Sequence, residues 1–264
     1  MLISSPHNPH LQRVRALLEK KKQRDEEQAF VVEGVRLVEE ALASGWQAEL
    51  ALFTAQLSER GRAVVRGLEA SGAEVCQVEP RLLDAAAGTE TPQGLLAVLK
   101  RKASALPEKL DFVLIADNLR DPGNLGTLLR SAAAAGAQAA LLSPGSTDAF
   151  SPKVLRAGMG AHFRLPILHL AWAEIHAACQ ENNLRVLLAE SAGGVSCWET
   201  DLRGPLALLV GSEAEGASAE GQALTAQAIH IPMPGQSESL NAAVAASILL
   251  FEVVRQRQGG HNGS

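Results

Sequence analysis

Residues 111–145 read DFVLIADNLRDPGNLGTLLRSAAAAGAQAALLSPG and change their hydrophobic pattern twice. The apolar run within 111–119 predicts a buried strand, and residues 137–145 predict a second one. Between these strands, residues 123–137 have the composition of an apolar helix that Gly136 closes. A strand, a helix and another strand in this order are typical of an α/β fold with a parallel sheet.

The same alternation continues to the end of the chain. Strands are predicted at 184–191, 206–213 and 228–233, a short helix capped by Ser151 at 151–160, and a final helix at 239–257. In open parallel sheets, ligands bind beyond the carboxyl ends of the strands. This rule brings together three loops that contain Gly or Pro, at residues 117–124, 211–218 and 231–241.

A charged segment without apolar periodicity, KRKASALPEKLD at residues 100–111, divides the chain. We expect a small α/β domain at residues 1–105 and a second domain at 106–264. In the first domain, Asn8 is expected to cap a helix that opens on Pro9 and extends to about Glu27. Strands are then predicted at 29–34, 48–55, 74–80 and 93–100, and helices at 35–45 and 58–72.

The overall composition is that of a globular protein. Of the 264 residues, 47% are hydrophobic and 20% are charged, and a net charge of −5 gives no general attraction for nucleic acid. The three cysteines have neither a disulfide spacing nor a metal-ligand spacing, so we expect no metal. The N-terminus lacks a signal-peptide core and no apolar run reaches membrane length, so we expect a cytoplasmic protein without a membrane partner.

The three loops contain none of the common phosphate-binding, dinucleotide-binding, metalloprotease or serine-hydrolase motifs. Glycines let a ligand approach the backbone, whose amides and carbonyls can recognise an adenine or a carboxylate without charged side chains. Ser239 can serve such a site, or it can be a simple N-cap of the final helix. The polar residues in and next to the loops are Asn118, Asn124, Arg130, Glu213, Ser239 and Asn241.

Three segments carry a family resemblance: NLRDPGNLGTLLRSAAAAGA at 118–137, LLVGSEAEGAS at 208–218 and IPMPGQSESLNAAVAASILLFE at 231–252. In this order they resemble the motifs of the SpoU/TrmH family, the RNA ribose 2′-O-methyltransferases of the SPOUT superfamily. The resemblance implies S-adenosylmethionine as cofactor, a homodimer with the active site at the subunit interface, and a trefoil knot in the parallel-sheet domain. Residues 23–42 also resemble the ribosomal-protein-like substrate domain of the rRNA-modifying branch.

The resemblance also implies roles for single residues. Arg130 matches the main catalytic residue of the family, and Asn124, Glu213, Ser239 and Asn241 would orient this arginine, the ribose or the cofactor. As a base, Arg130 is unfavourable because a guanidinium keeps its proton up to a pH of about 12. Alternatively, it stabilises the developing alkoxide or a phosphate while the proton leaves through water or phosphate. The cofactor pocket is expected at Leu209, Val210, Gly211, Ile231, Pro232, Met233, Ser239 and Leu240.

The substrate implied by the resemblance is RNA, most of all 23S ribosomal RNA, which residues 1–105 would select. Contacts with RNA phosphates are expected from Lys20, Lys21, Lys22, Arg24 and Arg156. The basic run can equally be a solvated helix end. The family often has a serine at the position of Gly158, so one hydroxyl contact is in doubt. Two alternatives stay open, namely a tRNA substrate and a catalytically silent RNA-binding protein of the same fold.

Overall fold

The structure, a computed structural model, describes residues 2–87, 92–102, 105–235 and 239–259. The chain forms two compact units, Met1–Ala103 with Phe150–Phe163, and Ser104–Ala149 with Arg164–Ser264. Residues 150–163, which the sequence places in the second predicted domain, therefore pack within the first unit. Within the described residues, no helix is long and apolar enough to cross a membrane.

The first unit is built around a mixed sheet with the strand order β1-β4-β3-β5-β2. Strands β1, β4 and β3 pair in parallel, and β5 pairs antiparallel with β3 and β2. Apolar side chains of α1 pack on one face of the sheet. The elements are β1 (Leu2–Ile3), α1 (Pro9–Glu19), α2 (Lys21–Glu27), β2 (Ala29–Glu33), α3 (Val35–Ala43), β3 (Ala48–Phe53), α4 (Glu59–Ala70), β4 (Glu74–Val78), α5 (Pro80–Asp84), β5 (Leu95–Lys100), α7 (Pro152–Gly158) and η1 (Ala161–Phe163).

The N-terminal helix departs from the sequence prediction. Asn8 caps it as expected, since its side chain accepts a hydrogen bond from the His10 N–H at 2.9 Å. The predicted single helix is wrong, however, because α1 ends at Glu19 and α2 begins at Lys21. Arg24 explains the break: its guanidinium is buried and donates from Nη1 to the carbonyls of Leu17, at 2.5 Å, and Leu18, at 3.2 Å. Arg24 thereby donates to two carbonyls at the end of α1 that would accept intrahelical hydrogen bonds in a continuous helix.

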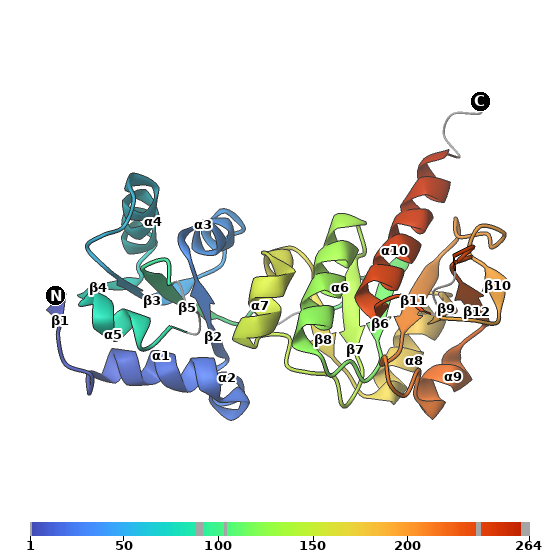
Figure 1. The fold of residues 1–264 in the computed structure, drawn as a ribbon, viewed down its shortest axis with the longest axis horizontal. Helices are drawn as coiled ribbons and strands as arrows, with labels where there is room; N and C mark the ends of the chain where they lie inside the picture. The colour runs from blue at the N-terminus through green and yellow to red at the C-terminus, as the bar shows by residue number, and fades with distance from the viewer. Residues whose placement is uncertain (1, 88–91, 103–104, 236–238, 260–264) are drawn as a thin grey trace. The chain divides into compact units, whose positions relative to one another are not determined.

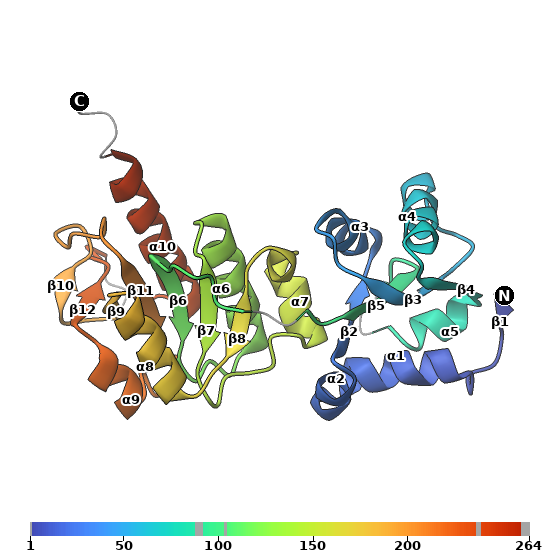
Figure 2. The ribbon, with the colours of Figure 1, turned by 180° about the vertical axis from the view of Figure 1, so that it is seen from behind.

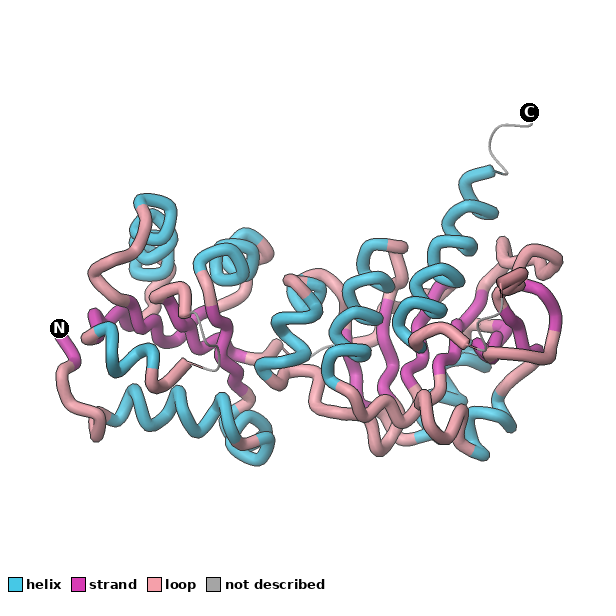
Figure 3. Tube along the Cα trace, in the orientation of Figure 1, coloured by secondary structure: helices cyan, strands magenta, loops and turns pink. Residues whose placement is uncertain are grey.

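The second unit holds a seven-stranded sheet with the order β10-β12-β9-β11-β6-β7-β8, and every pair in it is parallel. The parallel sheet predicted from the apolar runs is therefore confirmed. Its elements, which Figure 3 colours by secondary structure, are β6 (Phe112–Ala116), α6 (Pro122–Ala134), β7 (Ala139–Leu142), β8 (Ile167–His169), α8 (Trp172–Glu181), β9 (Arg185–Glu190), β10 (Val195–Ser196), β11 (Leu206–Val210), α9 (Ala219–Leu224), β12 (Gln227–His230) and α10 (Ala242–Gly259).

Helices cover both faces of this sheet. Figures 1 and 2 show α6 and α10 on one face and α8 and α9 on the other. Every residue of β6 and of β11 is buried, as strands between two helical layers require. Helix α10 packs on α6, where the hydroxyls of Ser131 and Ser247 lie 2.6 Å apart. The knot implied by the resemblance stays a prediction.

Candidate active site

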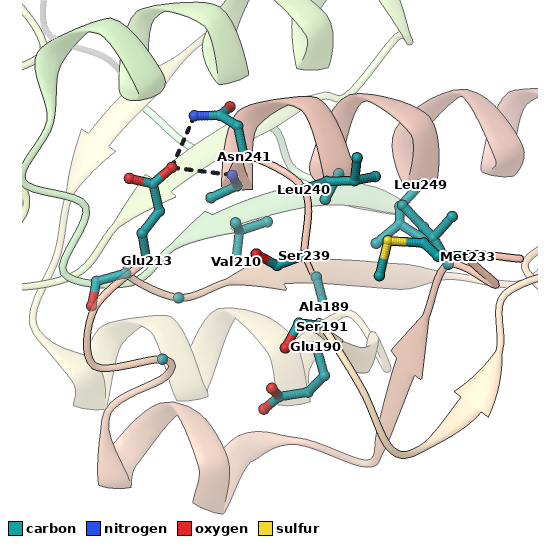
Figure 4. A pocket seen from close by; sticks show the side chains of 16 residues that line it. Ala189, Glu190, Ser191, Val210, Glu213, Met233, Ser239, Leu240, Asn241 and Leu249 are labelled. Atoms are coloured by element: carbon teal, nitrogen blue, oxygen red, sulfur yellow. Dashed lines mark hydrogen bonds between the residues drawn. The ribbon is translucent and has the colours of Figure 1, made fainter. Parts of the chain in front are cut away.

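A cavity of about 500 Å³ opens in the second unit at the carboxyl ends of β9 and β11 and at the loop that follows β12 (Figure 4). Its size lies in the usual range for small-molecule sites. Two of the three predicted loops line it, and the end of β9 joins them. The lining residues are Ala189, Glu190, Ser191, Val210, Gly211, Ser212, Glu213, Gly216, Ile231, Met233, Ser239, Leu240, Asn241, Ala242, Ala245 and Leu249.

A tight backbone hairpin forms one wall of the cavity. Ser212 and Gly216 exchange two backbone hydrogen bonds of 2.9 Å, which fold the chain back directly after β11. A Cβ atom on Gly211 would lie 2.4 Å from the carbonyl carbon of Gly216, and Gly216 itself has a φ of +70°. Glycine is therefore needed at both positions, and at these two positions the wall presents backbone to a ligand.

The polar mouth of the cavity centres on Asn241. Its Nδ2 donates hydrogen bonds of 2.9 Å to Asn124 Oδ1 and to Glu213 Oε1. Glu213 Oε1 also accepts from the Ala242 N–H at 3.2 Å, so this carboxylate lies at the N-terminus of α10, where the helix dipole favours an anion. Three of the predicted catalytic residues thus meet at one point, Asn124 from the first turn of α6 and the other two from the segments after β11 and before α10.

The start of α10 is capped by Asn241 rather than by Ser239. The Asn241 Oδ1 accepts from the N–H groups of Ala243 and Val244, at 3.0 Å and 3.2 Å, which is the pattern of an N-cap. The predicted start of the helix at residue 239 is therefore wrong, because α10 begins at Ala242. Ser239 is exposed and lines the cavity. Capping and site lining, which the sequence left as alternatives for Ser239, are combined in Asn241.

A buried carboxylate that the sequence analysis did not single out connects two loops around this site. Asp117, at the end of β6, is fully buried and accepts from the Ser143 hydroxyl at 2.9 Å and from the Ser218 N–H at 2.6 Å. The neighbouring Asn118 has a φ of +52° and donates from Nδ2 to Glu215 Oε2 at 3.2 Å. Glu215 is exposed and still holds this contact. The position of Asp117 directly after a predicted buried strand was the sequence signal for its role as a buried acceptor.

Arg130 lies on α6, is exposed and does not line the cavity. Among the described residues, its guanidinium has no hydrogen-bond or ion-pair partner. Arg130 is therefore not among the residues that line the cavity, and its catalytic role stays a prediction.

Most of the predicted cofactor-binding residues line the cavity. Val210, Gly211, Ile231, Met233, Ser239 and Leu240 do so. Two predicted residues do not: Leu209 is fully buried in the core beside the cavity, and Pro232 lies in the loop without lining it. The contribution of Glu190 was missed, although the rule about carboxyl ends, applied to the predicted strand at 184–191, would have found it.

The predicted RNA contacts are distributed unevenly. Lys20 is exposed, Lys21 pairs with Asp25 at 2.6 Å, and Lys22 pairs with Glu26 at 3.6 Å. Arg24 does not belong with them, because its guanidinium is buried and bonded to helix carbonyls. Arg156 lies in α7 and is half-buried, and Gly158 of the same helix is buried.

One group of possible metal ligands occurs in the described residues, at His10, Glu74 and Cys76, whose donor atoms lie within 4.8 Å of one another. An ion pair of 3.2 Å between His10 Nε2 and Glu74 Oε1 accounts for two of the three. Cys76 belongs to the apolar core of the first unit. These residues are not among those that line the cavity.

Comparison with known proteins agrees with this geometry. Residues 111–251 match the SpoU rRNA Methylase family, and residues 8–97 match the MRM3-like substrate binding domain. The chain is 34% identical over 237 residues to the 23S rRNA (guanosine(2553)-2′-O)-methyltransferase RlmP of Bacillus subtilis, with 89% of this chain and 92% of that protein covered.

Two solved structures extend the similarity to the whole fold. The AdoMet-bound rRNA methyltransferase from Sinorhizobium meliloti matches with a TM-score of 0.87 and 31% identity, over 100% of this chain and 99% of that one. The SpoU methyltransferase AviRb from Streptomyces viridochromogenes, in complex with the cofactor AdoMet, matches with a TM-score of 0.86 and 29% identity, over 96% and 99% of the two chains. The family resemblance carried by the three motifs is confirmed, and the chain belongs to the SpoU rRNA methylase family.

Proposed function

We propose that this protein transfers the methyl group of S-adenosylmethionine to a ribose 2′-hydroxyl of ribosomal RNA. The observation that carries the proposal is the cavity at the carboxyl ends of β9 and β11, with Asn124, Glu213 and Asn241 joined at its mouth. Membership of the SpoU rRNA methylase family, and similarity along the whole chain to methyltransferases solved with AdoMet, support this assignment.

The residues of the cavity fit this cofactor. Val210, Ile231, Met233 and Leu249 offer an apolar surface for an adenine, and the hairpin after β11 offers backbone groups. Two carboxylates, Glu190 and Glu213, line the cavity, and none of its lining residues is Lys or Arg. S-adenosylmethionine carries a sulfonium, an ammonium and one carboxylate, so its net positive charge suits such a lining.

The reaction is an in-line displacement, for which the bound cofactor supplies an already activated methyl group. The chain must then hold the 2′-oxygen in line with that methyl group and assist loss of the hydroxyl proton. Asn241, fixed by two hydrogen bonds, and Ser239 beside it are placed to orient the ribose. Arg130 acts either as the base or as the stabiliser of the developing alkoxide, with the proton leaving through water or phosphate.

A second copy of this chain would supply Arg130 to the cavity. Leu240, Val244 and Phe251 are 38%, 47% and 48% exposed, and Val244 and Phe251 lie seven residues apart on one face of α10. An apolar helical face exposed in this way is typical of an interface. Phe251→Glu should therefore give a monomer in light-scattering experiments and abolish methylation. Ala223→Glu, on the exposed surface of α9, should remain a dimer.

The first unit would select the RNA. Its match to the MRM3-like substrate binding domain over residues 8–97 favours ribosomal RNA over tRNA. The exposed cations Lys20, Lys21 and Lys22 would contact RNA phosphates, with Arg156 of α7 as a further contact.

The experiment that tests this function maps 2′-O-methyl groups in ribosomal RNA from cells with and without the protein. One site should lose its methyl group in the deletion strain and regain it with the wild-type chain. Arg130→Ala should not restore the methyl group, although its folding and cofactor affinity should stay near wild type. Arg203→Ala, at an exposed arginine of the same unit that does not line the cavity, should restore it. An unchanged methylation map in the deletion strain would refute the proposed function.

A further inference from the structure

One carboxylate in the cavity has no assigned role. Glu190 is the last residue of β9, is exposed and lines the cavity. It lies beside His230, because parallel pairing of β9 and β12 places these two residues in register. Within the described part of the chain, the Glu190 side chain makes no hydrogen bond or ion pair. Its oxygens are therefore available to a ligand.

Glu190 and the polar mouth occupy different ends of the cavity. Figure 4 shows the Glu190 carboxylate on the opposite side of Ser239 from the Asn241 amide. Methyl transfer has to occur at the mouth, where RNA can reach Asn241 and Glu213. The part of the cofactor that extends away from the sulfur, toward the apolar side chains after β12, is then the adenosine. Ile231 follows His230 directly, so Glu190 lies at the side of the cavity where this adenosine would bind.

We propose that Glu190 fixes the cofactor by accepting hydrogen bonds from the two ribose hydroxyls of its adenosine. This inference rests on the proposed function, which assigns the cavity to S-adenosylmethionine. An ionised carboxylate has only acceptors, and its two oxygens match two vicinal hydroxyl donors. Hydrogen bonds to a charged acceptor are stronger than neutral ones, so one side chain can orient the whole adenosine.

The ammonium of the cofactor suits Glu190 less well. It is one carbon away from the carboxylate of the same amino-acid group, which Glu190 would have to approach as well. No Lys or Arg lines the cavity to offset that repulsion. The ribose hydroxyls carry no charge and impose no such cost. Glu190 is therefore assigned to the sugar and not to the methionine part.

Calorimetry with S-adenosylmethionine, S-adenosylhomocysteine and 5′-methylthioadenosine separates these possibilities in the full-length protein. S-adenosylhomocysteine has the adenosine and the amino-acid group but no sulfonium charge. 5′-Methylthioadenosine has the ribose but no amino-acid group. Glu190→Ala should weaken both ligands by the same factor, about tenfold to a hundredfold. Glu190→Gln, which keeps one acceptor oxygen, should fall between wild type and Glu190→Ala. Glu199→Ala, at an exposed acid that does not line the cavity, should bind both ligands like wild type.

Kinetics gives a second measurement. Because the ribose contact is present before and during methyl transfer, Glu190→Ala should raise the KM for S-adenosylmethionine and leave kcat nearly unchanged. Thermal unfolding of this variant without ligand should match wild type, since Glu190 has no partner in the described fold.

Three results would overturn the assignment. If Glu190→Ala weakens S-adenosylhomocysteine but not 5′-methylthioadenosine, the carboxylate binds the ammonium. If the Glu190→Ala variant loses much more affinity for S-adenosylmethionine than for S-adenosylhomocysteine, the carboxylate faces the sulfonium. Unchanged affinity for all three ligands would show that it faces none of them. Failure of the wild-type protein to bind any of these ligands would instead refute the proposed function, and this inference with it.

Discussion

Asn241 should separate the stability of α10 from the chemistry of the site. Its Oδ1 caps the helix by accepting from the N–H groups of Ala243 and Val244. Its Nδ2 donates to Asn124 and Glu213. Because the two functions use different atoms of one side chain, substitutions that keep one atom and remove the other should affect stability and activity separately.

Asn241→Ser keeps an oxygen able to cap the helix and removes the amide donor. Serine and asparagine are similar as N-caps, so the free energy of unfolding should change by less than about 0.5 kcal/mol. Asn241→Ala removes the cap and should cost about 1 kcal/mol, or roughly 2–4 °C in Tm for a domain of this size. Both variants lose the bonds that hold Asn124 and Glu213 together, and both should therefore lose methyl transfer.

Asn241→Asp also keeps the capping oxygen and removes the amide donor, but it adds a negative charge. The new carboxylate caps the helix well, but it replaces a donor that lies 2.9 Å from Glu213 Oε1. At this separation, repulsion between two exposed charges is on the order of 1 kcal/mol. The helix dipole offsets about 0.3–1 kcal/mol of that cost. Stability should thus lie between those of the Ser and Ala variants, with methyl transfer lost as well.

The assay pairs thermal unfolding with single-turnover methylation of ribosomal RNA by each variant. An Asn241→Ser protein with wild-type stability and lost activity would agree with the two-atom division. Wild-type activity in Asn241→Ser would show that the amide donor has no part in the reaction. If this variant instead lost as much stability as Asn241→Ala, the cap assigned to Oδ1 would be wrong.

Three further predictions concern stability. Asp117→Ala leaves the Ser218 N–H without its buried acceptor, so chemical denaturation should show a loss of about 2–4 kcal/mol in the second unit. Arg24→Ala should lower the free energy of unfolding by about 1–3 kcal/mol because the Leu17 carbonyl loses a buried donor, while RNA affinity in a filter-binding assay stays at the wild-type value. Burial raises the pKa of the Cys179 thiol to about 11, so the native state holds this proton more tightly than the unfolded state. Urea titrations should show stability falling between about pH 9 and pH 11, and the fall should be smaller in Cys179→Ala.

The architecture of the second unit could be predicted because its strands are buried on both faces. The runs that form β6 and β11 are apolar at every position, and a helix with small side chains separates β6 from β7.

The break between α1 and α2 at Lys20 could not be predicted in this way. It depends on a hydrogen bond from the Arg24 guanidinium to the preceding helix, and residues 9–27 contain neither glycine nor an internal proline.

The packing of residues 150–163 was also beyond sequence patterns. Phe150 and Phe163 contact aromatic residues of the first unit, with ring centroids 4.9 Å from Phe30 and 5.7 Å from Trp46. These contacts join residues more than a hundred positions apart, so no local periodicity reports them. A fragment that begins near Glu108 would leave these apolar side chains without their partners. Substitutions of the exposed lysines in the full chain are therefore a cleaner test of RNA binding than truncation.

The loops of the candidate site were predictable for a different reason. Parallel strands end at a common edge, so the segments after β11 and β12 had to lie close together. That rule predicts which loops lie close together, but it does not predict which of their residues form hydrogen bonds. It could not show that Asn241, rather than Ser239, caps α10, because serine and asparagine are similar caps and the start of the helix shifts by only a few residues.

The cluster at the mouth of the cavity also couples the start of α10 to the rest of the site. Glu213 accepts from the Ala242 N–H in the first turn of α10, and Asn124 comes from the first turn of α6. The two helices also meet through Ser131 and Ser247. A displacement of α10 would therefore move the residues that are proposed to orient the ribose. The exposed apolar face of the same helix is the surface proposed for a second copy, so in that proposal dimer formation and the geometry of the site depend on one structural element.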